Sequence, residues 1–401
     1  MRFFFYSHDG LGLGHTRRNL AIASALTELN PKASILLATG TDEVSRLGVP
    51  PHVEILKLPG LSKVSNSSYV ARRLCIPVTD IRALRSALLT AAVSSFRPNV
   101  MLVDKHPIGA NGELCSALEE LRAAGGRAAL GLRDILDDRV TVLREWGFYK
   151  LQARIADYHD RVFVYGQQAV FDPITQYDFP VSVAERTEFC GYVVTRSNRE
   201  VGADDQPMLF PLKPTGRPVV LATTGGGEDG FTLLEAFIKA ASGAPWDGVV
   251  VAGPLAPENQ RQTLRRLAAR AGVAFHTFVA GLTGQLGLAD ALVCKGGYNT
   301  LVEAVANGIP TVCVPRTSPR REQLIRARAF AQLGLIRLLE PDQLDVNRLR
   351  AEVDAALRSS RQKVIEQANA VLHLDGAQRV AACLIELAET PRSTAAVHAA
   401  R

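Results

Sequence analysis

The stretch DALVCKGGYNTLVEAVANGIP, residues 290–310, decides the fold of this chain. An apolar run reaches Lys295, two glycines follow, and apolar residues then recur at helical spacing as far as Asn307. This order predicts a buried strand, a tight turn and a helix that begins near residue 298. Such a unit is typical of a doubly wound parallel sheet, in which ligands bind where the strands end.

Along the whole chain, short apolar runs alternate with longer stretches in which apolar residues recur at helical spacing. This series occurs twice, once in each half of the chain. In the first half we expect strands near 2–7, 33–38, 53–57, 100–104, 127–131 and 161–165, and helices near 15–29, 80–95, 111–124 and 138–156. In the second half we expect strands near 218–223, 248–252, 273–278, 291–295, 310–314 and 335–339, and helices near 229–242, 257–271, 283–289, 298–307, 321–332 and 343–358. The pattern predicts an α/β protein with two facing doubly wound, Rossmann-like domains and an interdomain cleft.

A polar stretch with three prolines interrupts this alternation and is the best candidate for a linker. The expected organisation is an N-terminal Rossmann-like domain at 1–196, a linker at 197–217, a C-terminal Rossmann-like domain at 218–375, a C-terminal helix at 376–390 and a disordered tail at 391–401. The C-terminal helix follows a break at Asp375-Gly376, and its sequence leaves open which domain it packs against.

The composition indicates a soluble globular protein and weighs against a nucleic-acid binder. The chain has 401 residues, of which 47% are hydrophobic and 21% charged, as in a soluble globular protein of two domains. Residues 1–196 hold 23 basic and 20 acidic side chains, which leaves 23 and 20 for residues 197–401. Neither half has the basic excess of a nucleic-acid binder. The six scattered cysteines form no CxxC pair, and no signal peptide or membrane span is evident, so we expect a cytoplasmic protein.

The first strand runs into a glycine-rich turn that contains Gly10, Gly12 and Gly14. The spacing is GxGxG, and no acidic residue follows the second strand, which weighs against a nicotinamide or flavin site. A tight turn without a ligand is the plainer alternative. His15 distinguishes this loop, because an imidazole at the positive end of a helix is favoured in the neutral form that a general base needs.

A histidine base usually has a carboxylate that orients it. Asp104 ends the strand at 100–104 and is followed by Lys105-His106, so both Asp104 and His106 are candidate partners of His15. A strand-terminal aspartate can also serve only as a cap. Asp134 is a third carboxylate at this edge, while Asp137 and Asp138 are more typical of helix N-caps.

In the second half, Lys295 and the backbone amides of Gly296 and Gly297 could hold a diphosphate at the start of a helix. Glu303 lies six residues beyond Gly297, too deep in the helix to cap it, and could accept from both hydroxyls of a ribose. The alternative is a surface glutamate on an amphipathic helix. Glu322 and Gln323 open a later helix and could bind vicinal sugar hydroxyls, although a solvated first-turn glutamate is also common.

Residues 290–323 resemble the donor-binding region of GT-B glycosyltransferases, especially the peptidoglycan N-acetylglucosaminyltransferase and the wider UDP-glycosyltransferases. The shared pattern is a glycine pair, Glu303 six residues later, Gly308-Ile-Pro310, and the Glu322-Gln323 pair. The loop that ends in Gly14-His15 resembles the acceptor-side loop of the same superfamily. The order of elements matches over nearly the whole chain, except for residues 57–97.

The resemblance implies roles for individual residues. His15 is the expected base with Asp104 behind it, and Glu303 the expected ribose ligand. The acceptor-side loop comprises Gly12, Gly14 and His106, and the donor site comprises Gly225, Gly226, Gly227, Lys295, Gly296, Gly297, Tyr298, Asn299, Thr300, Glu303, Arg321, Glu322 and Gln323. Lys295 stands where many relatives have a histidine, and the turn at 224–227 lacks the usual serine. Further cations expected near the diphosphate are Arg316 and Arg320.

We therefore expect an inverting glycosyltransferase that uses a nucleotide-diphosphate sugar, UDP-linked by resemblance, as a substrate and needs no cofactor. No Asp-x-Asp motif lies on a cleft-forming loop, so we expect no metal. Two alternatives keep the fold: a nucleotide-sugar epimerase or hydrolase, and a non-catalytic nucleotide-sugar-binding protein.

The acceptor cannot be inferred from the sequence: a small molecule, a glycan and a lipid-linked acceptor all stay open. Residues 57–97 contain seven basic side chains and one acidic one, Asp80. This excess could face an anionic acceptor or place the protein peripherally at the inner face of a membrane. A solvated helix face explains it equally well.

Overall fold

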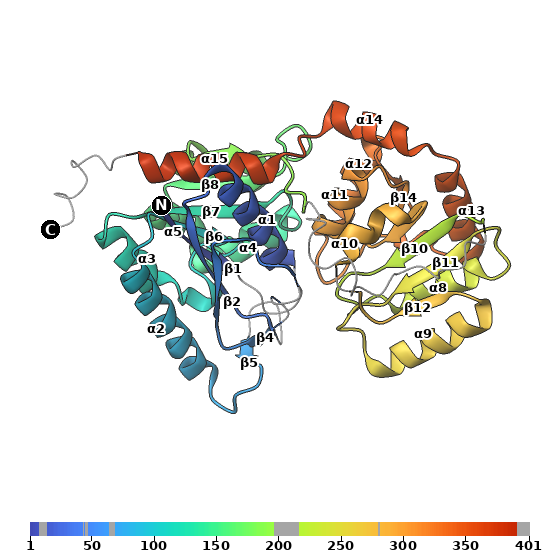
Figure 1. The fold of residues 1–401 in the computed structure, drawn as a ribbon, viewed down its shortest axis with the longest axis horizontal. Coiled ribbons are helices and arrows are strands. Elements are labelled where there is room, and N and C mark those ends of the chain that lie inside the picture. Colours follow the sequence, from blue (N-terminus) through green and yellow to red (C-terminus); the bar gives the residue numbers. More distant parts are fainter. Residues whose placement is uncertain are drawn as a thin grey trace.

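The computed structural model describes residues 1–7, 14–42, 44, 47–63, 69–195, 216–279 and 281–390. Figure 1 shows these residues as two α/β lobes side by side, one blue to green and the other yellow to orange. The fold class predicted from the sequence, two doubly wound Rossmann-like domains, is confirmed. The expected linker falls almost wholly in 196–215, and the expected tail is 391–401; both lie outside the described residues.

The first domain is built on a parallel sheet in the order β3-β2-β1-β6-β7-β8-β9. Its central strands are apolar on both faces because helices cover both sides. The strands are β1 Arg2–Ser7, β2 Ser34–Thr39, β3 Val53–Lys57, β6 Val100–Asp104, β7 Arg127–Arg133, β8 Arg161–Tyr165 and β9 Thr187–Phe189. The helices are α1 Gly14–Leu29, α2 Val78–Phe96, α3 Cys115–Ala123, α4 Arg139–Tyr149, α5 Leu151–Tyr158, α6 Pro173–Gln176 and α7 Val181–Ala184. A small antiparallel hairpin joins β4 Leu61–Lys63 to β5 Tyr69–Ala71.

The second domain is built on a parallel sheet in the order β12-β11-β10-β13-β14-β15. The strands are β10 Val219–Thr223, β11 Asp247–Val251, β12 Ala274–His276, β13 Ala291–Cys294, β14 Thr311–Cys313 and β15 Arg337–Leu338. The helices are α8 Phe231–Ala241, α9 Glu258–Ala271, α10 Leu282–Gln285, α11 Tyr298–Ala306, α12 Glu322–Gln332, α13 Val346–Leu357 and α14 Arg361–Val371. Because β10 and β13 are neighbours, the turns that follow them leave the same edge of the sheet side by side.

The last helix, α15 Gly376–Glu389, returns to the first domain. Figure 1 shows it in red along the blue and green lobe, where it packs against α1. At the crossing, Tyr192 N donates to His373 O at 2.7 Å and Gly376 N donates to Tyr192 O at 3.1 Å. A Cβ at position 376 would come within 2.7 Å of Gly191 O, so the close approach of the two crossing segments requires glycine there.

Several local features differ from the sequence prediction, among them the short elements α6, α7 and β9, which were not predicted. The expected helix at 138–156 is two helices, α4 and α5, because Lys150 between them has a φ of 49°. The β4–β5 hairpin was not predicted, since its strands are only three residues each. Helix α14 was also missed, because only Ala368 of its residues is buried and the apolar stripe is weak.

The basic segment 57–97 does not present all its charges to solvent, contrary to the expectation of a cationic face. Arg85 is buried: its Nε and Nη2 donate to the two oxygens of Glu113 at 2.6 Å each, and Nη1 donates to Pro59 O. Tyr6 donates to the same carboxylate at 2.5 Å. Lys57 and Arg73 pair with Asp42. Arg85 therefore anchors α2 to the sheet and cannot contact a membrane.

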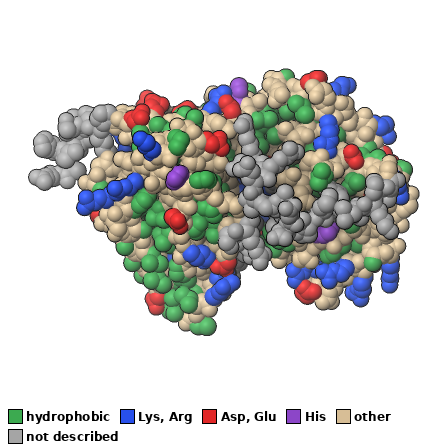
Figure 2. Space-filling model, viewed as in Figure 1, with side chains coloured by type: hydrophobic (Ala, Val, Ile, Leu, Met, Phe, Trp, Pro, Cys, Tyr) green, Lys and Arg blue, Asp and Glu red, His purple; other side chains and the backbone are tan. Residues whose placement is uncertain are grey.

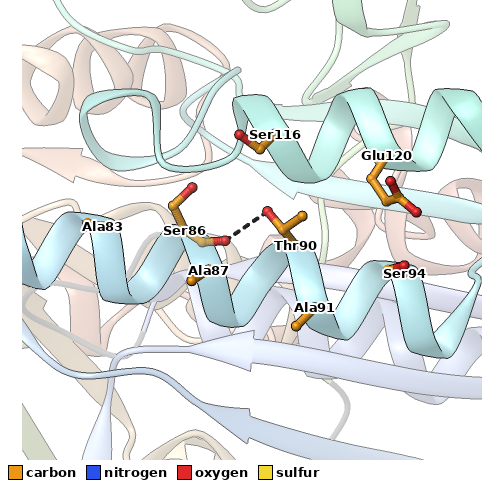
Figure 3. Close-up of a pocket in the computed structure, with 8 residues that line it drawn as sticks. All are labelled: Ala83, Ser86, Ala87, Thr90, Ala91, Ser94, Ser116 and Glu120. Atoms are coloured by element: carbon orange, nitrogen blue, oxygen red, sulfur yellow. Dashed lines mark hydrogen bonds between the residues drawn. The ribbon is translucent and has the colours of Figure 1, made fainter.

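The outer face of α2 carries apolar and small side chains. Figure 2 shows a hydrophobic area over this part of the first lobe, where Leu84 and Leu88 are 42% and 37% exposed. The shallow groove in Figure 3 follows α2 and α3 and is lined by Ala83, Ser86, Ala87, Thr90, Ala91, Ser94, Ser116 and Glu120. None of these is a predicted site residue. No helix within the described ranges is long and apolar enough to cross a membrane.

Replacing Arg85 by methionine should lower the free energy of unfolding by about 3–5 kcal/mol, because it leaves the buried Glu113 carboxylate without its cation. Urea denaturation followed by far-UV circular dichroism measures the change. Arg82→Met, three residues earlier on the same helix and exposed, is the matched control and should cost less than about 1 kcal/mol. Equal stability of Arg85→Met and wild type would contradict the anchoring role.

Candidate active site between the two domains

The first turns of α1 and α11 meet across the domain interface. Asn299 Nδ2 donates to Gly14 O at 3.1 Å, and a Cβ at position 14 would lie 3.4 Å from that nitrogen. Each helix follows a turn at the carboxyl edge of its own sheet. The two edges predicted to bind ligands therefore face one another. Gly12, like Gly10, lies outside the described residues.

The structure brings together His15 and Asp104, the two residues expected to form a base and its carboxylate. His15 Nδ1 lies 3.2 Å from Asp104 Oδ2, at the buried end of β6. His106, the rival partner, follows β6 by two residues and is half-buried, with its backbone N donating to Asp104 O at 3.1 Å. The ring of His15 is 15% exposed, so it can reach a bound molecule.

Arg18 is a third member of this group, and sequence reasoning missed it. The Nη2 atom of Arg18 donates to both oxygens of Asp104, at 2.9 and 3.2 Å, and lies 2.8 Å from His15 Nδ1. The guanidinium is buried over the rings of Tyr165 and Tyr298, with centroid distances of 5.6 and 5.3 Å. Its position three residues after His15, on the same helix face, was the available signal.

Asp104 stays ionised despite complete burial. Desolvation acts to raise the pKa of this carboxyl, but the charge of Arg18 and then that of His15 outweigh it and bring the pKa to about 2. The carboxylate can therefore orient His15 and stabilise its protonated form without taking the proton itself.

The pKa of Asp104, about 2 against an ordinary 3.8, makes stability depend on pH. Because the folded value is the lower one, this carboxylate contributes about 2 kcal/mol above pH 4, and the contribution is lost as pH falls toward 2. The stability advantage of wild type over Asp104→Asn should therefore shrink by about that amount between pH 5 and pH 2 in urea titrations. A constant difference over this range would contradict the assigned ion pairs.

On the second-domain side, two glycine turns adjoin. Gly227 has a φ of 93°, and a Cβ there would come within 2.4 Å of Ala252 O, so only glycine fits. Gly296 has a φ of 80°, and a Cβ there would meet Cys313 Sγ at 2.8 Å. Gly225 and Gly226 complete the first turn, and Gly297 precedes α11, whose amides no side chain of the described residues caps. Uncapped backbone amides at the start of a helix are a typical binding site for a phosphate group, so a diphosphate could bind here.

Tyr298 and its neighbours on α11 differ in exposure. The Tyr298 side chain is buried, and its hydroxyl accepts from Val193 N at 3.0 Å, so it could contact a diphosphate only through its backbone amide. Asn299 and Thr300 are half-buried in the first turn of α11.

Glu303, the predicted ribose ligand, is buried and already engaged. Arg17 of the first domain donates to both of its oxygens from Nη2, at 2.7 and 2.9 Å. The reading of Glu303 as an exposed surface residue is wrong, since only 2% of its side chain is accessible. A ribose that bound this carboxylate would have to displace the guanidinium.

The cations predicted near the diphosphate are mostly paired within the chain. Lys295 Nζ lies 2.8 Å from Asp229 Oδ2, and Arg316 Nη2 donates to Glu322 at 2.6 Å. Arg320 binds first-domain carboxylates instead, Glu145 at 2.8 Å and Asp137 at 3.1 Å. To reach a diphosphate, as predicted, Arg320 would have to leave these two carboxylates.

Arg321 is exposed, and its backbone N donates to Asp137 Oδ1 at 2.7 Å. Asp137 is thus an interdomain contact and not a helix cap, contrary to expectation. Asp138 does cap α4, accepting from Thr141 N at 3.1 Å.

Glu322 and Gln323 begin α12 beside the Gly296 turn. Glu322 is buried, and although burial raises its pKa, the charges of Arg133 and Arg316 lower it overall. Its Oε2 atom has no hydrogen-bond partner among the described residues. Gln323 Oε1 accepts from Arg316 N at 3.2 Å, so a sugar would have to compete for this amide.

Asp134, the third predicted edge carboxylate, joins the domains. Arg326 of α12, fully buried, donates to its two oxygens at 2.6 and 2.9 Å. Arg326 also lies over the Tyr298 ring, with its guanidinium carbon 5.5 Å from the centroid. This buried pair fixes how α12 sits against the end of β7.

Two facing Rossmann-like domains, with the last helix packed on the first domain, form the GT-B fold. Solved structures of glycosyltransferases are similar to this chain over nearly its whole length. The calicheamicin glycosyltransferase CalG4 matches 97% of this chain and 98% of its own, with a TM-score of 0.59 and 18% identity. The MurG structure from Acinetobacter baumannii matches 96% and 99%, with a TM-score of 0.57 and 13% identity. At these identities the likeness shows the fold alone.

Sequence comparison points to the same superfamily for the second domain. The model of the glycosyltransferase family 28 C-terminal domain matches residues 248–381. The UDP-N-acetylglucosamine–N-acetylmuramyl-(pentapeptide) pyrophosphoryl-undecaprenol N-acetylglucosamine transferase of Corynebacterium efficiens is 30% identical over 137 residues, 34% of this chain and 36% of that protein. The chain spans about a third to a half of the length of such relatives. The predicted resemblance to the peptidoglycan N-acetylglucosaminyltransferase is confirmed.

Proposed function

We propose that this protein transfers a sugar from a nucleotide-diphosphate sugar, UDP-linked, to an acceptor hydroxyl, with inversion at the anomeric carbon and without a metal. The observation that carries the proposal is the juxtaposition of two half-sites. The amide-rich turns after β10 and β13, typical of diphosphate binding, face His15 and Asp104 across the domain interface. The family match at 248–381 supports the donor half.

In the proposed reaction, His15 Nε2 takes the proton of the acceptor hydroxyl while its oxygen attacks the anomeric carbon. The bond between that carbon and the diphosphate oxygen breaks, and the products are a glycoside and a nucleoside diphosphate. Asp104 accepts from the Nδ1–H of His15 and stabilises the imidazolium. The Nη2 of Arg18, now 2.8 Å from Nδ1, must then donate to Asp104 alone, because a protonated Nδ1 cannot accept.

The proposed donor site takes the diphosphate at the first turn of α11 and the sugar at Glu322 and Gln323. The unpartnered Glu322 Oε2 suits a sugar hydroxyl, which can donate to it. The ribose hydroxyls bind Glu303 after Arg17 leaves.

The acceptor stays open within this proposal. The family match lies in the second domain, so it carries nothing about the first, where an acceptor would bind. Contact with an anionic membrane also stays a prediction: the apolar face of α2 favours it, while the burial of Arg85 removes part of its electrostatic basis.

The reaction is tested by mixing the protein with UDP-, dTDP- and GDP-sugars and a panel of acceptors, and measuring nucleoside diphosphate release. We expect release that requires an acceptor and falls about 10²-fold or more in His15→Ala. His52→Asn, in an exposed turn with positive φ, is the control and should keep full activity.

Three outcomes would contradict the proposal or a part of it. Quantitative conversion of the donor to an epimer or a free sugar without acceptor would favour the epimerase or hydrolase. Tight donor binding with no turnover for any acceptor would favour a non-catalytic binding protein. Turnover that a chelator abolishes and Mg²⁺ restores would contradict the metal-free mechanism.

Competition between Arg17 and the ribose has its own test. Arg17→Met should tighten UDP binding about fivefold, the effect of about 1 kcal/mol, because the ribose no longer displaces a guanidinium from Glu303. Isothermal titration calorimetry measures it. Arg320→Met breaks a different interdomain ion pair and should leave UDP affinity unchanged. Weaker UDP binding in Arg17→Met would place Arg17 among the donor's ligands instead.

A further inference from the structure

Arg133, at the carboxyl end of β7, is a cation that the proposed function does not use. It is the last residue of β7 and lies beside Tyr165 of β8. Its side chain forms no hydrogen bond or ion pair with the described residues, and its Nε atom is buried without a partner. The side chain as a whole is half-buried, and its Nε–H is the part withdrawn from water. A buried donor without a partner is costly, and an anionic ligand that accepts from it would remove that cost.

The charges around Arg133 offset its own charge only in part. Burial lowers the pKa of this guanidinium, the charge of Glu322 raises it, repulsion by Arg326 and Arg18 lowers it and Asp134 raises it, with a pKa of about 10 as the result. Both neighbouring arginines are already bound to carboxylates, Arg326 to Asp134 and Arg18 to Asp104. Arg133 is therefore still a cation at neutral pH, and its two neighbouring cations already have carboxylate partners.

The position of Arg133 places it near the Gly296 turn. The next residue, Asp134, is held by Arg326, and the same Arg326 donates from Nη1 to Gly296 O at 3.3 Å. Glu322, whose charge acts on Arg133, lies one helical turn before Arg326 on α12. The end of β7 thus approaches the second domain where β13 turns into α11.

Three cations of the second domain that were expected near the diphosphate are already paired with carboxylates. Lys295 and Arg316 each have an acidic partner within the same domain, and Arg320 binds two carboxylates of the first. Near the first turn of α11, two described cations form no ion pair with a carboxylate: Arg321, exposed just before α12, and Arg133 of the opposite domain. Of these two, Arg133 is the one with a buried donor atom that lacks a partner.

We propose that Arg133 binds the diphosphate of the nucleotide donor from the first-domain side of the interface. This inference rests on the proposed function. Arginine suits the role, because its planar donors can bind two phosphate oxygens at once. Because Arg133 belongs to the first domain and the diphosphate would be held by the second, this contact would also stabilise the interface between the domains when the donor is bound. Negative charge that develops on the leaving diphosphate would be stabilised by the same contact.

The test compares UDP, uridine and inorganic diphosphate by isothermal titration calorimetry against wild type, Arg133→Met and Arg133→Lys. Arg133→Met should weaken UDP and inorganic diphosphate about tenfold or more and leave uridine unchanged, while Arg133→Lys should fall between. Arg144→Met removes an exposed cation of α4 in the same domain, and it should leave all three affinities unchanged.

Thermal unfolding separates this role from a structural one. Because Arg133 forms no hydrogen bond or ion pair within the described residues, Arg133→Met should have a nearly unchanged Tm without ligand and a smaller rise in Tm with UDP. A lower Tm with unchanged UDP affinity, or a parallel loss for UDP and uridine, would overturn the inference while the proposed function stands. Failure of wild type to bind any of the three would overturn the proposed function, and the inference with it.

Discussion

Two buried arginine–aspartate pairs around the ring of Tyr298 hold the functional half-sites in register. Arg18 binds Asp104 within the first domain, and Arg326 of the second domain binds Asp134 of the first. Both guanidinium groups lie over the Tyr298 ring, at 5.3 and 5.5 Å from its centroid. Breaking either pair would leave a buried charge without compensation, which costs several kcal/mol. The position of α11 against α1, and with it the distance between the Gly296 turn and His15, depends on these contacts.

The ionic groups of the site are largely paired with one another in the absence of a donor. Glu303 binds Arg17, Lys295 binds Asp229 and Arg316 binds Glu322. Each pair avoids the cost of a buried or half-buried lone charge. In the proposed function, a donor exchanges some of these partners for its own hydroxyl and phosphate groups. The proposed affinity is then the difference between two sets of interactions, and donor binding would be coupled to the contact between the domains.

The fold could be predicted from the sequence because a parallel sheet covered on both faces leaves a simple pattern. The apolar runs at 2–7, 100–104 and 161–165 coincide with β1, β6 and β8. Elements held by few buried side chains were missed, such as α14 and the β4–β5 hairpin. The break between α4 and α5 depends on one left-handed residue, Lys150, which no periodicity reveals.

Many residues of the site could be predicted from the sequence, but the partners with which they interact could be predicted only in part. Strand ends and glycine turns identify the edges where His15, Asp104 and Gly296 lie, since these depend on local sequence. The partners of Glu303 and Arg320 are 286 and 175 residues or more away, and only the docking of the domains brings them together. Arg133 and Arg18 were missed for the same reason, because their importance lies in what surrounds them and not in a motif.

A crystal structure of the protein with UDP tests the central claim most directly. The account predicts a diphosphate at the first turn of α11 within hydrogen-bond distance of Arg133. It also predicts ribose hydroxyls on Glu303, with Arg17 displaced. UDP bound away from the turns after β10 and β13, or a bound nucleotide with the Arg17–Glu303 pair intact, would contradict it.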